Sequence, residues 1–132
     1  MNIEKIQKKI NEIKYWDSKV LDINSRYFGD EIEILIESEE ENICWSIIFE
    51  SCYSVNYITD ADWRKKNYLV KNMKYGQLGY FGQDITVEKS KLEDFVEVHA
   101  DLTLLKLDII CRKVRVKKQK VSHQDIFWSM KR

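Results

Sequence analysis

The feature that most constrains this chain is an alternation of apolar and polar residues with a period of two, which starts after residue 16 and recurs up to residue 116. Successive side chains of a β-strand point to opposite faces, so this alternation is typical of strands with one buried face. The strand-like segments are separated by short turns and show no βαβ rhythm. The pattern therefore predicts a mainly β (α+β) fold, an antiparallel β-sandwich or partly open barrel of six to eight strands.

Helices are predicted at the two ends of the chain. A helical stripe with Asn2 as its cap is formed by Ile3, Ile6, Ile10 and Ile13. Near the other end, Ser122 and Asp125 have capping-box spacing, which predicts a short C-terminal helix over 122–130. Its apolar residues Ile126, Phe127 and Trp128 are expected to pack back onto the body of the protein.

The length of 132 residues fits one domain. We expect a helix over 1–15, an antiparallel β body over 18–118 and a C-terminal tail over 121–132. No apolar run has the length of a membrane span, and the first residues carry charges where a signal peptide needs an apolar stretch, so we expect a cytoplasmic protein. No cofactor motif is present, and the three cysteines have neither disulfide-framework nor zinc-site spacing, so they are interpreted as small buried hydrophobes.

Three irregular stretches interrupt the alternation. The segment 43–57 is either one long bent strand or two strands broken near Glu50 and Ser51. The apolar parity changes near 110–112, which predicts a bulge or sharp bend. Three glycines, Gly76, Gly79 and Gly82, follow a polar connection over 60–75. We expect at least one of them to have a positive φ or to lie at a bulge or close backbone approach.

The charges are strongly segregated along the chain. Residues 27–63 contain ten acids and no base. One interpretation is structural, because oppositely charged strands can pair side by side. The other is a negative surface for a basic partner, with aromatic anchors beside it. The predicted partner-binding residues are Glu37, Glu39, Glu40, Glu41, Asp60, Asp62, Tyr80 and Phe81.

Other functions have weaker support in the sequence. His99, Asp101 and Glu97 share one strand face and form the only local group that resembles an acid–base pair, but a hydrated strand face explains them as well, so we predict no enzyme and no metal site. The stretch 112–120 holds six bases in nine residues, which would suit a phosphate track or would balance acids on a neighbouring strand.

A set of local sequences resembles small uncharacterised proteins of low-GC Gram-positive bacteria, some of which are encoded near polymorphic toxins and regarded as immunity proteins. These sequences are Trp16-Asp17-Ser18, Tyr27-Phe28-Gly29-Asp30, Cys44-Trp45 and Gln77-Leu78-Gly79-Tyr80-Phe81-Gly82-Gln83-Asp84. The resemblance spans about residues 15–118 and transfers no catalytic residue. It implies a non-enzymatic cytoplasmic protein that binds and neutralises a toxin domain, such as a nuclease with a basic cleft.

Two alternatives stay open at this level. One is a β-barrel that binds a small ligand through Trp45, Phe49, Tyr53 and Tyr57, because lining and ordinary core look alike in sequence. The other is a nucleic-acid-binding module that uses the basic strand 112–120. The balance of 22 bases and 22 acids argues against the second.

Overall fold

The structure is a computed structural model that describes residues 2–63 and 69–128. Its regular elements are the helix α1 (Ile3–Glu12) and the strands β1 (Val20–Arg26), β2 (Glu31–Glu37), β3 (Ile43–Thr59), β4 (Asp84–Lys89), β5 (Val96–Asp101) and β6 (Leu105–Lys120). Single 3-10 turns are η1 (Tyr27–Gly29), η2 (Ala61–Trp63), η3 (Val70–Asn72), η4 (Tyr75–Gln77) and η5 (Val121–His123).

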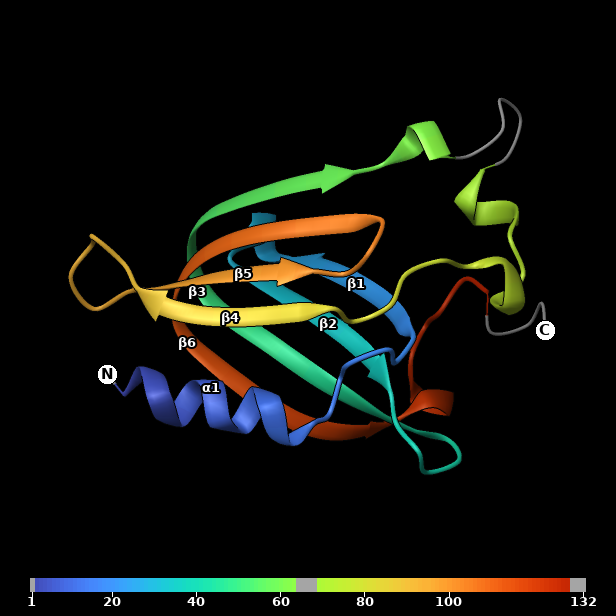
Figure 1. The fold of residues 1–132 in the computed structure, drawn as a ribbon, viewed down its shortest axis with the longest axis horizontal. Helices are drawn as coiled ribbons and strands as arrows, with labels where there is room; N and C mark the ends of the chain where they lie inside the picture. The colour runs from blue at the N-terminus through green and yellow to red at the C-terminus, as the bar shows by residue number, and fades with distance from the viewer. Residues whose placement is uncertain (1, 64–68, 129–132) are drawn as a thin grey trace.

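The six strands form one open antiparallel sheet in the order β1-β2-β3-β6-β5-β4 (Figure 1). This confirms the mainly β prediction. The sheet coils strongly, and the segments that precede its two edge strands meet at isolated bridges, Trp16 with Gly82 and Lys19 with Phe81. The first residues of both edge strands are therefore held together without a continuous ladder.

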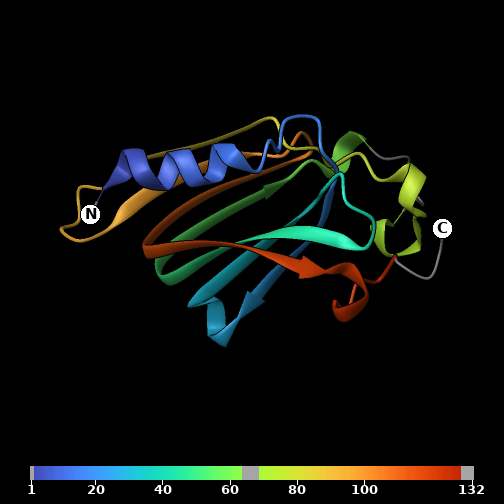
Figure 2. The ribbon, with the colours of Figure 1, turned by 90° about the horizontal axis from the view of Figure 1, so that it is seen from below.

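Helix α1 lies across one face of the sheet (Figure 2). Its cap is as predicted, since the Asn2 side chain accepts a hydrogen bond from the Lys5 backbone N–H at 3.0 Å. Its apolar stripe ends in Ile10 and Ile13, which are buried in the main core. The main core also contains the alternating residues of the strands, among them Ile34, Ile47 and Ile109, none of which is exposed.

A second core lies on the opposite face of the sheet. Its buried members are Leu21, Leu35, Cys44, Met73, Leu78, Ile126 and Trp128. They come from three strands, from the connection before β4 and from the chain after β6. The Trp128 indole N–H donates to the Leu21 carbonyl at 2.7 Å, which fixes the end of the described chain on this face.

The long strands β3 and β6 pair along nearly their whole length, so segment 43–57 is one bent strand rather than two. The register shifts between Cys52 and Ser54. Directly before this shift, Ser51 has a φ of +55°. The predicted parity change in β6 is present as well, because Cys111 and Val114 both face the main core. The extra residue lies in β3, because Cys52 pairs with Cys111 and Ser54 pairs with the next residue of β6, Ile110.

Of the conformations predicted for Gly76, Gly79 and Gly82, a positive φ is not found: among the described glycines only Gly29 has one, at +89°. None of the three glycines in the segment 76–82 lies in a regular strand. Gly82 is explained by close approach, since a Cβ there would lie 2.4 Å from the Tyr15 carbonyl oxygen. This contact lies at one of the two bridges that join the sheet edges.

The C-terminal helix is also not found in the described residues. The chain instead makes the 3-10 turn η5 and continues irregularly through residues 124–128, while residues 129 and 130 lie outside the described part. The predicted packing is correct for Ile126 and Trp128, which are buried, but not for Phe127, which is 42% exposed. Contacts with the second core determine the path of this segment, rather than helical hydrogen bonds.

The edge of the sheet is protected by side chains of the N-terminal segment. The Gln7 side chain donates to the Ile85 carbonyl at 2.8 Å and accepts from the Val87 N–H at 2.7 Å. The Tyr15 hydroxyl accepts from the Ile85 N–H at 2.8 Å. These contacts satisfy the outer backbone groups of β4. Glu31 and Glu33 take no part in edge protection, because β2 is an inner strand.

Candidate partner-binding surface

The acidic loop, residues 37–42, connects β2 to β3 and forms the wall of a hollow. The hollow has a volume of about 410 Å³ and is lined by Glu37, Glu39, Glu40 and Glu41 together with the apolar residues Leu21, Ile43, Val121 and Trp128. A negative rim over an apolar floor can receive a basic side chain and cover its aliphatic stem at the same time.

Not all carboxylates of this loop are free. Glu40 pairs with the Lys118 ammonium at 2.8 Å, and Glu37 accepts a hydrogen bond from the Tyr75 hydroxyl. Glu39 and Glu41 are exposed, and within the described residues neither makes an ion pair or a side-chain hydrogen bond. The carboxylates open to a partner are therefore those of Glu39 and Glu41.

The two other predicted acids lie elsewhere. Asp60 and Asp62 are exposed and follow the end of β3, whereas the acidic loop precedes the start of that strand. Figure 1 shows these two segments on opposite sides of the molecule. The structure does not gather the predicted acids into one patch.

Tyr80 and Phe81, the predicted aromatic anchors, are both half-buried, and neither ring is substantially exposed. The backbone explains this, because Tyr80 accepts from the Val20 N–H and Phe81 donates to the Leu102 carbonyl, and the segment is held on both sides. Tyr80 lines a groove of about 270 Å³ between β1, the end of β3 and the tail.

The residues predicted to line a ligand cavity are not brought together. Phe49 is fully buried in the main core, and Trp45 packs against that core from the side. Tyr53 is 68% exposed and stacks edge-on against Phe95. Only Tyr57 of the four lines the groove beside Tyr80.

The basic strand is partly neutralised by acids. The Arg115 guanidinium lies 2.5 Å from Glu50 and 4.0 Å from Glu31, and Lys118 pairs with the acidic loop. The structural interpretation of the charge segregation is correct at these positions. A phosphate track along β6 would have carboxylates beside it.

Glu33 is a carboxylate with only 2% of its surface exposed, at the centre of a polar network. It accepts from the Ser46 hydroxyl at 2.5 Å, from the Arg26 guanidinium at 2.9 Å and from the Gln119 amide at 3.0 Å. Burial raises the pKa of Glu33, but the hydrogen bonds from Ser46 and Arg26 outweigh burial, and the net pKa is lowered.

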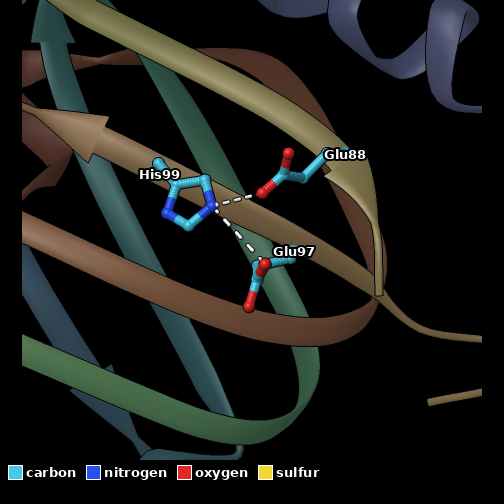
Figure 3. A group of neighbouring side chains, drawn as sticks. All are labelled: Glu88, Glu97 and His99. Atoms are coloured by element: carbon cyan, nitrogen blue, oxygen red, sulfur yellow. Dashed lines mark hydrogen bonds and ion pairs between the residues drawn. The ribbon is translucent and has the colours of Figure 1, made fainter. Parts of the chain in front are cut away.

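His99 forms a second network, which brings together strands β4, β5 and β6. Its Nδ1 lies 2.5 Å from Asp108. Its Nε2 lies 2.7 Å from Glu88 and 3.5 Å from Glu97, and Figure 3 shows these two contacts. Hydrogen bonds to Asp108 and Glu88 raise the pKa of His99. Asp101, the predicted partner, instead accepts from the Thr103 N–H.

The His99 group is half-exposed and does not lie in any of the hollows described above. The ligating atoms of Glu88, Glu97 and His99 lie within 4.8 Å of one another, so among the described residues these three could hold a metal ion. The imidazole already has a hydrogen-bond partner on each nitrogen. The geometry is that of a charged surface network rather than of a nucleophilic site.

The cysteines have the inert environment that the sequence suggested. Cys44 and Cys111 are buried, and Cys52 is half-buried opposite Cys111. Burial raises the pKa of the Cys44 and Cys52 thiols to about 11 and that of Cys111 to about 12. The thiols are therefore protonated at neutral pH and are poor nucleophiles.

One exposed aromatic group was missed by the sequence reasoning. Tyr27 and Phe28 form the tip of the β1–β2 hairpin, and they are 73% exposed and fully exposed, respectively. Both have left-handed backbones, with φ of +55° and +59°. The sequence signal was the pair of aromatics directly before Gly29-Asp30, which the predicted partner-binding residues did not include.

No helix in the described parts of the chain has the length and hydrophobicity needed to cross a bilayer. A family model described as Immunity protein PIM7 matches residues 2–118, and the chain belongs to this family of immunity proteins. The expectation of an immunity protein is confirmed at this level.

Comparison with solved structures supports the fold alone. The crystal structure of an uncharacterized protein from Neisseria gonorrhoeae is 12% identical in sequence, with a TM-score of 0.53. The match covers 78% of this chain and 92% of that chain. No curated protein matches the sequence.

Proposed function

We propose that this protein is a cytoplasmic inhibitor that neutralises a cognate toxin by binding it, without catalysis, through the acidic loop. The observation that carries this proposal is the hollow behind the loop, where four glutamates stand over the buried indole of Trp128. A basic domain, such as a nuclease with a phosphate-binding cleft, is the partner class that this charge fits.

Glu39 and Glu41 are the central contacts in this proposal, because their carboxylates have no partner in the described residues and are free to pair across an interface. Asp60 and Asp62, at the far end of β3, would extend the negative field rather than share the hollow. Tyr80 and Phe81 are half-buried and would contribute through the rim of the neighbouring groove.

The test uses the polypeptide encoded by the gene adjacent to this one, with protection of cells and binding kinetics as readouts. Steering by exposed charges acts on association, so we expect the association rate to fall as salt is added. Reversal of two charges in Glu39→Lys/Glu41→Lys should slow association about 10-fold or more.

The matched control is Glu4→Lys/Glu93→Lys, which makes the same change of charge at two exposed sites outside the loop. If both double variants bind alike, or if association does not depend on salt, the loop is not the contact. If the wild type gives neither binding nor protection against that polypeptide, the toxin assignment itself fails.

A further inference from the structure

The aromatic tip, Tyr27 and Phe28, combines two properties that folding does not favour. The first is exposure, since the Phe28 ring is fully exposed and the Tyr27 side chain nearly so, and within the described residues neither ring contacts another ring or a cation. A solvated aromatic pair at a turn stabilises nothing by burial.

The second property is backbone conformation. The φ values of +55° and +59° place both residues in the left-handed region, where a Cβ crowds the following carbonyl. Hairpin turns with this geometry favour Asn, Asp and Gly, which adopt it at little cost. Strained residues of this kind cluster at functional sites, because the surrounding structure must hold them in place.

The remainder of the hairpin holds the tip firmly. Arg26 of β1 and Glu31 of β2 lie directly opposite each other in the antiparallel ladder below the tip. The Asp30 N–H donates to the Tyr27 carbonyl at 3.1 Å. Asp30 itself is exposed beside the rings. The hairpin therefore presents two preorganised aromatic side chains next to a carboxylate, and buried aromatic anchors of this kind dominate the energy of many interfaces.

We infer that the aromatic tip is an anchor that inserts into an apolar pocket with a basic rim on the toxin domain. This inference rests on the proposed function and adds a second contact to it. The acidic loop lies at the other end of β2, so the two contacts are separate sites. They differ in their roles. The loop speeds encounter through charge, whereas the tip prolongs the complex through desolvated contact.

The test is the variant Tyr27→Asn/Phe28→Gly, compared with the wild type against the polypeptide encoded by the adjacent gene. Both new residues suit a left-handed backbone, so the melting temperature should stay the same or rise. Dissociation should become about 10- to 100-fold faster with the association rate nearly unchanged. The control is Tyr53→Asn, which removes an exposed aromatic from β3 and should leave dissociation unchanged.

The possible failures can be told apart. If the wild type binds no such polypeptide, the proposed function fails and this inference fails with it. If the wild type binds and the tip variant dissociates at the wild-type rate, only the anchor is overturned. A melting temperature that falls by several degrees would show that the tip is structural. A wild-type dimer that the variant converts to monomer would show that the occupant is a second copy of this chain.

Discussion

Two carboxylate networks lie on the sheet face turned away from the main core, and they differ in how far they are exposed. Glu33 alternates with the core residues of β2, and His99 alternates with those of β5, so both point away from that core. Glu33 lies on the same face of β2 as Leu35 of the second core and is 2% exposed. The His99 side chain is 41% exposed, and the side chains of its partners Glu88 and Asp108 are 59% and 49% exposed.

The difference shows that the location of a charge in the fold, more than its partners, decides what it contributes. Each network has three or more polar contacts. In the buried network, loss of one partner leaves buried groups without water to replace it, which is costly. In the open network, water and salt replace a lost partner, so the contribution is small.

The largest expected effect comes from removing the largest buried side chain of the second core. Trp128→Ala deletes a side chain that is 1% exposed, together with its hydrogen bond to Leu21. We expect a loss of about 3–5 kcal/mol in the free energy of unfolding, measured by chemical denaturation. The control is Phe127→Ala, whose ring is half-exposed and should cost much less. Equal losses in the two variants would contradict the buried position of Trp128.

The next effect comes from removing the buried charge. Glu33→Ala leaves the hydroxyl of Ser46 and the amide of Gln119 without their acceptor, and Arg26 without its carboxylate. We expect a loss of about 2–3 kcal/mol, again from denaturation curves. Glu40→Ala removes an exposed ion pair and serves as the comparison, with a loss below about 1 kcal/mol. A neutral Glu33→Ala would contradict the network described here.

Acidification should affect the same network. The folded pKa of Glu33 is lowered, so its stabilisation is present above the unfolded-state pKa and is lost as the pH falls through the folded value. The stability difference between the wild type and Glu33→Gln should therefore shrink in acid. Denaturation curves over an acid pH series measure this difference, and a gap that is constant or widens in acid would contradict the lowered pKa.

The smallest effect belongs to the open network. The folded pKa of His99 is raised, so its stabilisation is present below the unfolded-state pKa and is lost as the pH rises through the folded value. Because its side chain is 41% exposed, solvent screening limits the loss in His99→Gln to less than about 1 kcal/mol, seen on the acidic side of that value. A loss as large as that of Glu33→Ala would mean that the two networks do not differ in the way proposed.

The sequence by itself determined the elements whose pattern is local. The period-two alternation, the Ile stripe of α1 and its Asn2 cap depend on residues within a few positions of each other, and all three are correct. The bend in β3–β6 was also visible, because a change of parity is a local signal. The immunity class was expected from short local sequences that the family match then supported.

The tertiary structure alone decided how these elements meet. Sheet order places β6 between β3 and β5, and this brings Asp108 to His99 and Arg115 to Glu50. Leu35 and Trp128 are 93 positions apart in the numbering, yet they belong to one core, which lies on the face of β2 that carries Glu33. Side-chain periodicity states which residues share a face, but pairing and covering between distant segments depend on the packing of the whole chain. For that reason the sequence shows where the acidic residues are, but only the fold shows that Glu33 is buried whereas Glu39 and Glu41 are exposed.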